Sequence, residues 1–370
     1  MAPYRFPERL EKFRALLAQN GLDAFLVSVP ENRYYLSGYE ADDLQLTESS
    51  GHLLLTATHA YLLTDSRYAE AAKAEAPGFE VLIYSQGLAQ VLPDLFSSLK
   101  TEKLGLEAHF LTCLTFKKVE EVLKKTRPSA EPAPVDNFVE QLRIIKEPGE
   151  IELIVRSLRL TENALRALWG KISPGMRERA LAWQIEAAIR QGGGQAVSFP
   201  PIAATGPNAA LPHAVPTDRE VKPGEPVILD LGSRLDMYCS DMTRTWIDGD
   251  PEPKLKEIYR IVRQAQLAAQ DFIGEGKSST EVDGAARKLI ADAGYGDYFG
   301  HGLGHGVGLA VHERPGLRKN EPVILEENMV VTIEPGIYLP GYGGVRLENM
   351  VRITRSGCEQ LSTDDFFYEW

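Results

Sequence analysis

The chain has 370 residues, of which 44% are hydrophobic and 25% charged, and its formal net charge at pH 7 is −12. This length exceeds one typical domain and predicts two, with the composition of an ordinary globular protein. The acidic charge argues against non-specific binding to nucleic acid or to an anionic membrane, because both of these surfaces require basic patches.

The cysteines and the N-terminal residues indicate the cellular compartment in which the protein is expected. Three cysteines stand far apart, at positions 113, 239 and 358, and form no C-x-x-C pair. This usage is typical of a reducing compartment and predicts neither a disulfide framework nor a zinc–thiolate site. Residues 1–21 are amphipathic and charged throughout, without the apolar core of a signal peptide, and no apolar run reaches membrane length. We therefore expect a cytoplasmic protein.

The first third of the sequence alternates strand-like and helix-like segments. Apolar runs with β-branched residues predict strands in residues 23–29, 52–64, 79–85 and 103–108. Helical spacing predicts helices in residues 66–76, 87–100 and 114–125. These elements predict an α/β domain over residues 1–134. Because residues 127–136 carry three prolines among small and acidic residues, they are interpreted as a linker.

The remaining two thirds begin with a long helical region near Glu147, with Pro148 as a first-turn residue. Two later segments resemble each other at an offset of 101 residues, with identical isoleucines or glycines at the pairs 172/273, 175/276, 189/290 and 193/294. Each segment has a glycine-containing lead-in, one helix and a further glycine. Chance similarity between two amphipathic helices explains this equally well. If the similarity is structural, residues 135–370 form two similar halves, and a site can lie at their interface.

Four carboxylates stand among apolar, strand-like runs of this second region. They are Asp230 in PVILDLG, Asp241 in YCSDMTRTWI, Glu334 in MVVTIEPG and Glu348 in GGVRLENMVRI. A single acid in such a run is more often an outward-facing strand residue or a turn former. Four of them make that explanation weak, because buried carboxylates are paired or bind a metal. We expect a cation that joins them.

Residues 301–312, HGLGHGVGLAVH, combine three histidines with alternating glycines. The H-x-x-x-H spacing of His301 and His305 would suit one face of a helix, but each glycine costs a helix about 1 kcal/mol relative to alanine. An extended segment places His301 and His305 on one face and leaves the other face bare, which permits close approach of another backbone or a ligand. A flexible glycine-rich loop is an equal alternative.

Carboxylate oxygens with one imidazole suit manganese or a similar divalent ion better than structural zinc, which prefers cysteine and histidine. Two divalent cations neutralise four carboxylates beside a neutral histidine, whereas one cation leaves an excess of two negative charges. The charge balance therefore predicts a dinuclear centre, of the kind whose metals lie about 3.5–4 Å apart and clamp a nucleophilic water.

These residues carry a resemblance to a known family. The ordered set Asp230, Asp241, His305, Glu334 and Glu348 resembles the ligand set of the pita-bread metallopeptidases, in the matching contexts LDLGSRLDMYCSDMTRT, GHGLGHGVGL, VVTIEPGIY and GGVRLEN. ENRYYLSGY and LLTDSRY resemble the smaller domain of Xaa-Pro aminopeptidases, prolidases and creatinases. The resemblance implies an α/β N-terminal domain over residues 1–134 and an α+β pita-bread catalytic domain over residues 135–370, with two pseudo-symmetric halves.

The resemblance also implies the metal ligands. Asp230 would bind one metal only, and His305 and Glu334 would bind the second metal. Asp241 and Glu348 would bridge the two.

Further residues match catalytic positions of the family. His213 and His312 resemble its substrate-side histidines, with His312 donating to the developing oxyanion. His301 matches the extra histidine of the proline-directed branch, and Arg346 an arginine that contacts the ligands. Glu334 would also handle a proton during the reaction.

The implied activity is metal-assisted hydrolysis of the Xaa-Pro bond at the N-terminus of small peptides, as in an Xaa-Pro aminopeptidase. The implied cofactors are two divalent metals, Mn²⁺ first and Co²⁺ or Zn²⁺ as alternatives, and the implied assembly is a homodimer. The proline-directed branch binds peptides with proline in the second position, and neither nucleic acid nor a membrane is an expected partner.

A prolidase restricted to dipeptides is the alternative, and it needs a cation for the dipeptide's free carboxylate. Arg314 and Arg318 are candidates, although both are equally well described as solvated surface arginines. Some prolidases resemble this segment with an arginine where Gly316 stands, so the sequence favours the aminopeptidase. Two more distant alternatives are a metal-free creatinase-like hydrolase and a non-catalytic binding protein of the same fold. Both are expected to lose ligand residues, and all five positions are filled here.

Overall fold

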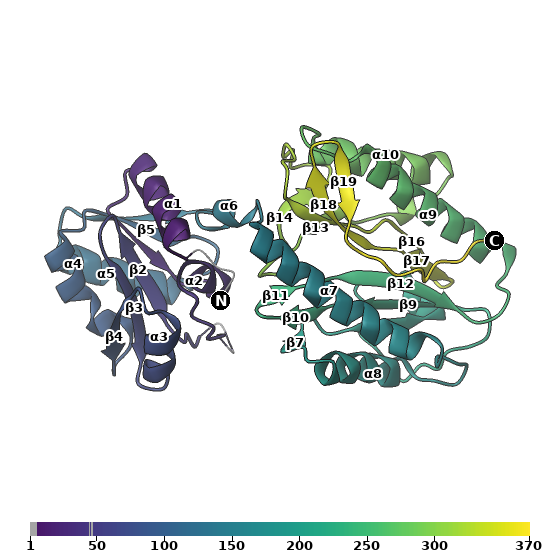
Figure 1. The fold of residues 1–370 in the computed structure, drawn as a ribbon, viewed down its shortest axis with the longest axis horizontal. Helices are drawn as coiled ribbons and strands as arrows, with labels where there is room; N and C mark the ends of the chain where they lie inside the picture. The colour runs from purple at the N-terminus through teal and green to yellow at the C-terminus, as the bar shows by residue number, and fades with distance from the viewer. Residues whose placement is uncertain (1–5, 44, 46) are drawn as a thin grey trace. The chain divides into compact units, whose positions relative to one another are not determined.

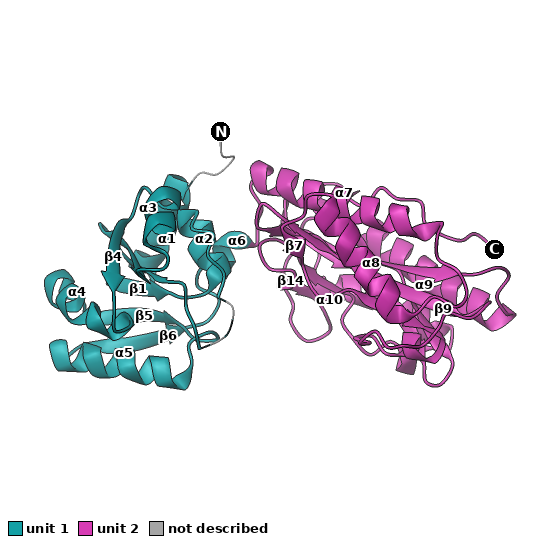
Figure 2. Ribbon diagram, turned by 90° about the horizontal axis from the view of Figure 1, so that it is seen from below, with its two compact units in different colours: residues 1–143 teal, residues 144–370 magenta. Residues whose placement is uncertain are grey.

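The structure, a computed structural model, describes residues 6–43, 45 and 47–370. The chain divides into two compact units, residues 1–143 and 144–370 (Figures 1 and 2). The boundary expected at 134/135 lies inside a strand of the first unit. Among the helices of the described residues, none has the length and hydropathy that crossing a bilayer requires.

The first unit contains a six-stranded mixed sheet with the order β4-β3-β2-β1-β5-β6. Its strands are β1 (Ala24–Val27), β2 (His52–Thr56), β3 (Ala60–Asp65), β4 (Glu80–Tyr84), β5 (Lys103–Glu107) and β6 (Glu131–Val135). The pairs β1–β2 and β2–β3 are antiparallel and the other pairs are parallel. The strand predicted over residues 52–64 is two strands, because the chain turns between Thr56 and His59 and pairs with itself.

Helices cover both faces of this sheet (Figure 1). They are α1 (Phe6–Gln19), α2 (Pro30–Ser37), α3 (Ala69–Glu75), α4 (Leu92–Leu99), α5 (Cys113–Thr126) and α6 (Glu140–Arg143), with a 3-10 turn η1 (Leu88–Gln90). The apolar faces of α4 and α5 pack with Leu26 and Leu104 of the sheet. On the other face, Phe13 of α1 meets the ring of Phe25 edge-on at 5.8 Å. Strand residues 25 and 26 thus point to opposite layers, as the two-residue period of a strand requires.

The linker predicted over residues 127–136 is wrong, because Glu131–Val135 form strand β6 and pair in parallel with β5. Proline removes one backbone donor and is confined to edge strands of sheets. β6 is such an edge, so Pro132 and Pro134 are accommodated there. The composition of this segment indicates an edge strand as readily as a linker.

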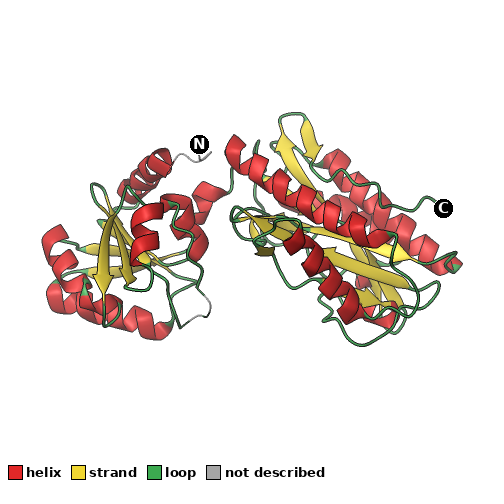
Figure 3. Ribbon diagram, turned by 60° about the horizontal axis from the view of Figure 1, so that its bottom comes forward, coloured by secondary structure: helices red, strands yellow, loops and turns green. Residues whose placement is uncertain are grey.

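The second unit contains two pairs of helices. They are α7 (Pro148–Trp169) with α8 (Glu178–Gln191), and α9 (Pro253–Phe272) with α10 (Ser279–Asp292). The predicted long helix at Pro148 is confirmed, and Glu147 caps it in a reciprocal capping box with Glu150. Figure 3 shows these helices (red) packed against the strands (yellow).

The internal similarity, which the sequence left open against chance, is structural. Helices α8 and α10 each have 14 residues, and their bounds differ by the same 101 residues. The paired glycines adopt the same left-handed backbone, with φ of +90° at Gly175 and +79° at Gly276, and +100° at Gly193 and +87° at Gly294. Only glycine adopts such angles without strain, which explains why these positions match. Residues 144–370 therefore form two pseudo-symmetric halves, as the fold class predicts.

The strands of the first half form two small sheets, with orders β11-β10-β7 and β12-β9-β8. The strands are β7 (Ala196–Val197), β8 (Ile202–Thr205), β9 (Pro226–Leu231), β10 (Ser233–Leu235), β11 (Tyr238–Cys239) and β12 (Met242–Ile247). The β9–β12 pair is antiparallel, as the sequence predicts. A 3-10 turn, η2 (Gly206–Ala210), follows β8.

The second half contributes a sheet of order β14-β13-β15-β18-β19 and the hairpin β16–β17. Its strands are β13 (Gly304–Gly306), β14 (Glu313–Leu317), β15 (Val330–Ile333), β16 (Gly336–Leu339), β17 (Gly343–Arg346), β18 (Asn349–Thr354) and β19 (Gly357–Gln360). A 3-10 turn, η3 (Gly296–Tyr298), precedes them. The buried faces of α9, α10, β15 and β18 form one continuous apolar core.

The extended segment predicted around His305 is confirmed for residues 304–306, which form β13 between β14 and β15. A Cβ on Gly304 would lie 2.0 Å from the carbonyl oxygen of Thr332, and one on Gly306 would lie 2.3 Å from that of Arg314. The absence of side chains therefore allows close approach of the neighbouring backbones.

Candidate metal centre

Two of the candidate acids come from the first half of the second unit. Asp230 is the fifth residue of β9, and Asp241 immediately precedes β12. The antiparallel register pairs Asp230 with Thr243, two residues after Asp241. The hairpin predicted from the sequence thus brings both acids to one edge.

The other three residues come from the second half. His305 is the central residue of β13, Glu334 directly follows β15, and Glu348 lies between β17 and β18. The backbone N–H of Glu334 donates to the carbonyl of Leu303 (2.8 Å), which holds Glu334 beside the β13 segment. The N–H of Glu348 donates to the carbonyl of Thr243 (3.0 Å). This second bond ties the two halves together at the site.

The potential ligand atoms form three overlapping groups. In each group they lie within 4.8 Å of one another: Asp230, Asp241 and Glu348; His305, Glu334 and Glu348; and Asp241, His305 and His312. Asp241, Glu348 and His305 each belong to two groups. The structure therefore brings all five sequence-predicted ligands together, with His312 at the same place.

The bonding of these side chains fits a bound cation. Among the described residues, one carboxylate oxygen of each of Asp230, Asp241 and Glu348 is buried without a hydrogen-bond partner. Buried polar atoms are nearly always paired, and buried charges are either paired or coordinate metals, so these oxygens are suited to bind a cation. His305 Nδ1 lies 3.0 Å from the carbonyl of Gly306, to which it donates, so Nε2 is the nitrogen left to bind a metal. That nitrogen faces Glu334 Oε1 (3.3 Å) and Asp241 Oδ2 (3.5 Å).

Without a cation the acids repel one another. Burial, and then the charges of Glu348 and Asp230, raise the pKa of Asp241 well above its usual range. Burial, and then the charges of Glu334 and Asp230, raise the pKa of Glu348 to about 8. Groups that resist ionisation at neutral pH are favourable sites for divalent ions, because the ion removes the repulsion.

His305 and Glu334 behave as an ion pair in the absence of metal. Burial opposes the charge on His305, but the hydrogen bond and charge of Glu334 outweigh it and raise the histidine pKa to about 9. Burial likewise opposes the charge on Glu334, while the hydrogen bond and charge of His305 lower its pKa to about 2. A metal at this position would replace the imidazole proton.

Arg346 contacts the candidate ligand Asp230. Its Nη2 donates to Asp230 Oδ2 (2.7 Å), and its Nε donates to Thr243 Oγ1 (3.0 Å). Thr243 in turn donates to Glu348 Oε2 (2.8 Å). The predicted contact of Arg346 with a ligand is present. Thr243 was not singled out from the sequence, although it stands two residues after Asp241 and therefore on the same side of the extended chain.

Tyr338 links this arginine to His301. Arg346 Nη1 donates to the Tyr338 hydroxyl (3.0 Å), which lies 2.8 Å from His301 Nε2. His301 Nδ1 donates to the carbonyl of Gly302 (2.7 Å), so its Nε2 accepts a hydrogen bond from the Tyr338 hydroxyl. Burial lowers the pKa of His301, which favours this neutral ring. The sequence motif IEPGIY contains Tyr338, but strand pairing with β17, not spacing, brings it to the site.

The remaining histidines differ in exposure from the ligand candidates. His312 is exposed, and its ring centroid lies 4.2 Å from that of His305. Burial, and then the positive charge of His305, lower the pKa of His312, with His213 contributing in the same direction. His213 is exposed and precedes the buried Ala214. His312 therefore lies beside the ligand candidates, His213 lies close enough to influence its charge, and both are open to solvent.

Arg244 supports the site from inside the protein and was not singled out from the sequence. Its Nη1 donates to the carbonyl of Glu348, and its Nη2 donates to Asn349 Oδ1 (2.9 Å). Asp364 accepts from its Nε (2.7 Å), and both side chains are fully buried. The C-terminal segment thus helps to fix the backbone of Glu348.

The two arginine candidates lie on and just after β14. Arg314 is exposed, and Arg318 is exposed and paired with Glu321. The side chain of Arg318 lies close to Gly316, because a Cβ there would be 3.2 Å from Arg318 Nε. A Cβ on Gly302 would be 3.1 Å from Arg318 Cβ, so Arg318 adjoins the His301–Gly302 segment.

Comparison with known proteins gives consistent matches along the whole chain. Residues 152–355 match metallopeptidase family M24, and residues 9–145 match the creatinase/prolidase N-terminal domain. The Xaa-Pro dipeptidase of Pyrococcus furiosus is 36% identical over 96% of this chain and 97% of its own length. An Xaa-Pro dipeptidase structure from Bacillus anthracis matches with 35% identity, a TM-score of 0.91 and 98% coverage of both chains. An X-Pro aminopeptidase structure from Thermotoga maritima matches with 34% identity and a TM-score of 0.85, over 96% of this chain and 98% of that one.

Proposed function

The chain belongs to metallopeptidase family M24, and we propose that it hydrolyses the peptide bond before proline, with Xaa-Pro dipeptides as its preferred substrates. The relatives in several organisms named Xaa-Pro dipeptidase favour this alternative over the aminopeptidase that the sequence favours. The observation that carries a hydrolytic function is the cluster of buried carboxylates with unpaired oxygens at the interface of the two halves.

Two divalent metals would be held by this cluster, with Mn²⁺ proposed as the native ion because the donors are mainly carboxylate oxygens. Asp230 would bind one metal, and His305 and Glu334 the other, while Asp241 and Glu348 would serve both. When bound, such metals polarise a substrate carbonyl and lower the pKa of a water molecule. The unpaired oxygens of Asp230, Asp241 and Glu348 support this assignment.

The protein groups then have separate tasks. Glu334 would accept the proton of the attacking water and deliver it to the proline nitrogen, which leaves as an amine. His312 would donate a hydrogen bond to the oxygen that becomes negative in the transition state, and His213 and His301 would line the substrate site. Arg346 would hold the Asp230 carboxylate through its 2.7 Å contact and keep its own charge next to the acids.

A dipeptide ends in a carboxylate directly after proline, so a dipeptidase needs a cation there. We propose Arg318, because its side chain lies against Gly316, where some prolidases have an arginine, and adjoins the segment of His301. A charge-assisted hydrogen bond contributes about 1.5–3 kcal/mol, or roughly tenfold or more in specificity.

The test compares kcat/KM for Ala-Pro and Ala-Pro-Ala with manganese present. The dipeptide is expected to be preferred at least about tenfold. Arg318→Ala is expected to remove this preference, and Arg355→Ala is the matched control, since Arg355 is likewise an exposed arginine paired with a glutamate. A higher kcat/KM for the tripeptide in the unaltered enzyme would instead assign the protein as an Xaa-Pro aminopeptidase. Retention of the preference in Arg318→Ala would exclude this arginine as the anchor.

Metal analysis of the purified protein decides among the more distant alternatives. Two equivalents of metal together with Xaa-Pro hydrolysis fit the proposal. Hydrolysis without metal fits a creatinase-like enzyme, and the absence of both metal and hydrolysis fits a binding protein. We also propose a homodimer, to be measured by light scattering, and a cytoplasmic location, which the separated cysteines support.

A further inference from the structure

Glu178, the first residue of α8, is a fully buried acid to which the proposed reaction gives no task. An acid in the first turn of a helix commonly stabilises that helix from the surface. Here the side chain is buried, and its hydrogen-bond donors among the described residues all lie outside α8, at Thr205, Asn208 and Thr217. Because a buried carboxylate requires such donors, this acid is matched to the segment that supplies them.

The three donor residues belong to one loop, residues 205–217, which carries His213. One oxygen of the carboxylate, Oε1, accepts from the backbone N–H of Thr205 (2.8 Å), at the start of the loop. The other oxygen, Oε2, accepts from the backbone N–H (2.8 Å) and the hydroxyl (2.6 Å) of Thr217, at its end. The side-chain amide of Asn208 donates to both oxygens, at 3.0 and 3.1 Å. A single buried carboxylate thus closes the base of the loop, whose two ends lie together as in a compact Ω-loop.

Little apolar surface is buried at the tip of this loop. Leu211 and Val215, on either side of His213, are 56% and 80% exposed. The carbonyl of Pro212 accepts a hydrogen bond from Arg346 Nη1 (3.1 Å), which ties the tip to an arginine of the metal centre. Because burial contributes little there, the hydrogen bonds at the base of the loop and at Pro212 fix the place of His213.

The equivalent helix of the other half makes a similar contact with a histidine-bearing segment. Asp283 of α10 is 1% exposed and accepts from the backbone N–H of Leu303 (3.1 Å). It also pairs with Arg287 (2.7 Å), whose Nη2 donates to the carbonyl of His301 (2.7 Å). In each half, therefore, the second helix uses a buried carboxylate to hold the segment with one of the two histidines assigned to the substrate site.

We propose that Glu178 is a positioning residue for His213, because it fixes the loop of residues 205–217 so that the imidazole meets the substrate in one place. Glu178 acts through the histidine and not by touching the substrate. The proposal rests on the role proposed for His213 in Xaa-Pro hydrolysis. A misplacement of about 1 Å costs an enzyme roughly a hundredfold in rate, so the loop base matters for catalysis as well as for stability.

The experiment is a double-mutant cycle on the manganese-loaded full-length protein, with Glu178→Gln, His213→Ala and their combination. Glutamine keeps the size of the side chain but turns an amide N–H towards the donors of the loop, so the loop base is loosened. Glu178→Gln is expected to lower kcat for Ala-Pro about tenfold and to keep both metals. In the His213→Ala background the same change is expected to lower kcat less than about twofold, because no histidine is left to misplace.

Asn208→Ala tests the same contact from the side of the loop and serves if Glu178→Gln does not fold. It removes the donor that contacts both carboxylate oxygens and leaves the buried acid in place. It is expected to lower kcat about threefold to tenfold, and again to have little effect without His213. Hydrogen-exchange mass spectrometry without substrate is expected to show faster exchange in residues 206–216 of both variants.

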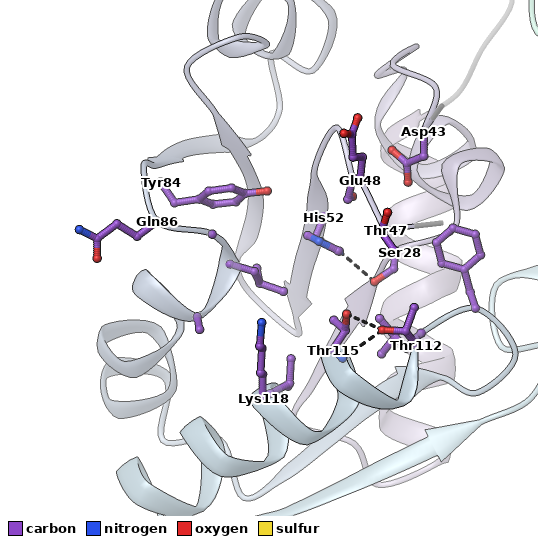
Figure 4. A pocket seen from close by; sticks show the side chains of 17 residues that line it. Ser28, Asp43, Thr47, Glu48, His52, Tyr84, Gln86, Thr112, Thr115 and Lys118 are labelled. Carbon is purple, nitrogen blue, oxygen red and sulfur yellow. Dashed lines mark hydrogen bonds between the residues drawn. The ribbon is translucent and has the colours of Figure 1, made fainter. Parts of the chain in front are cut away.

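Glu107→Gln is the matched control. Glu107 is 4% exposed and likewise accepts from two backbone N–H groups, those of Ser28 and Val29, and from the side-chain amide of Asn32. The hydroxyl of Ser28 in turn contacts a histidine, His52 (2.9 Å), in the wall of a pocket of the first unit (Figure 4). Because His52 has no task in the proposed reaction, Glu107→Gln is expected to leave kcat unchanged.

The outcomes separate this proposal from the proposed function. Absence of Xaa-Pro hydrolysis in the unaltered protein would overturn the proposed function and, with it, the role of Glu178. If the unaltered protein hydrolyses Ala-Pro, three results overturn the positioning role alone. They are an equal loss in Glu178→Gln with and without His213, unchanged exchange in residues 206–216, and an equal loss of kcat in Glu107→Gln.

Discussion

Both units of the protein bury carboxylates, but they treat them differently. Glu107, in the first unit, accepts hydrogen bonds from the backbone N–H groups of Ser28 and Val29 and from the side chain of Asn32, at 2.5–2.7 Å. Asp241 and Glu348, in the second unit, are equally buried but each keeps one oxygen without a partner. A buried acid whose oxygens are all hydrogen-bonded stabilises its own unit. An unsaturated cluster, in which buried carboxylate oxygens lack partners, is suited to bind a cation that the chain does not supply.

The largest expected effect comes from removing one charge of the unsaturated cluster. Asp241→Asn or Glu348→Gln is expected to lose one or both metals and to lower kcat/KM about a thousandfold or more, because the two cations are then poorly compensated. Metal content by mass spectrometry and Xaa-Pro hydrolysis measure this. Glu107→Gln is the matched control and is expected to keep both metals.

Full activity with two bound metals in either cluster variant would remove the dinuclear assignment. Loss of metal in Glu107→Gln would erase the distinction between the two kinds of buried acid.

The exposed histidines are expected to separate catalysis from metal binding. His312→Ala and His213→Ala are each expected to lower kcat about a hundredfold while leaving two metals bound, because their hydrogen bonds act in the transition state. His312 lies within ligand distance of Asp241 and His305. The metal content of the His312→Ala variant is therefore a more decisive measurement than that of His213→Ala. A parallel loss of metal and activity would make His312 a ligand.

A smaller effect is expected from the groups behind the cluster. Asp364→Asn leaves the buried Arg244 without its carboxylate and loosens its hold on the backbone of Glu348. Metal affinity is expected to fall about tenfold to a hundredfold, the usual range for residues that orient ligands. Asp365→Asn, an exposed neighbour, serves as the control. Unchanged affinity in Asp364→Asn would limit this ion pair to a structural role.

The pH dependence of stability compares the two kinds of buried acid directly. A carboxyl group whose pKa is higher in the folded chain than in the unfolded chain destabilises the fold as pH rises between the two values. For Glu348 this window runs from its ordinary value of 4.5 to about 8, and for Glu107 from 4.5 to about 7. Each such group changes the free energy of unfolding by about 1.4 kcal/mol per pH unit within its window.

Urea unfolding at pH 6, 7 and 8 measures this. The metal-free protein is expected to lose more stability between pH 7 and pH 8 than the metal-loaded protein, because the contribution of Glu107 ends near pH 7. Equal slopes with and without metal would mean that the cluster carries no unusual proton affinity.

The sequence predicts the four candidate acids because each one stands within or beside an apolar strand, which is a local signal, whereas the ligand role of His305 came from the family resemblance. The glycines at 175, 193, 276 and 294 are similarly local, since their left-handed backbone excludes other residues. From the residues alone, two similar halves remained no more plausible than chance similarity, and the family resemblance implied them.

Long-range pairing accounts for what the sequence does not predict. Tyr338 reaches Arg346 only because β16 pairs with β17, and Arg244 meets Asp364 across 120 residues. Neither contact can be recognised from the residues close to it in the sequence. The strand β6 was missed for a different reason, because its prolines are typical of linkers and are tolerated only where a sheet has a free edge.

Gly304 and Gly306 place a limit on how this site can change over evolution. Neither contributes a donor atom, yet a methyl group at either position would collide with the backbone of Thr332 or Arg314 and displace His305, which stands between them. A saturation library selected for Xaa-Pro hydrolysis is therefore expected to tolerate substitutions at 304 and 306 as poorly as at the acids. Any descendant protein that keeps this chemistry is expected to keep glycine at both positions, because even alanine is not accommodated there.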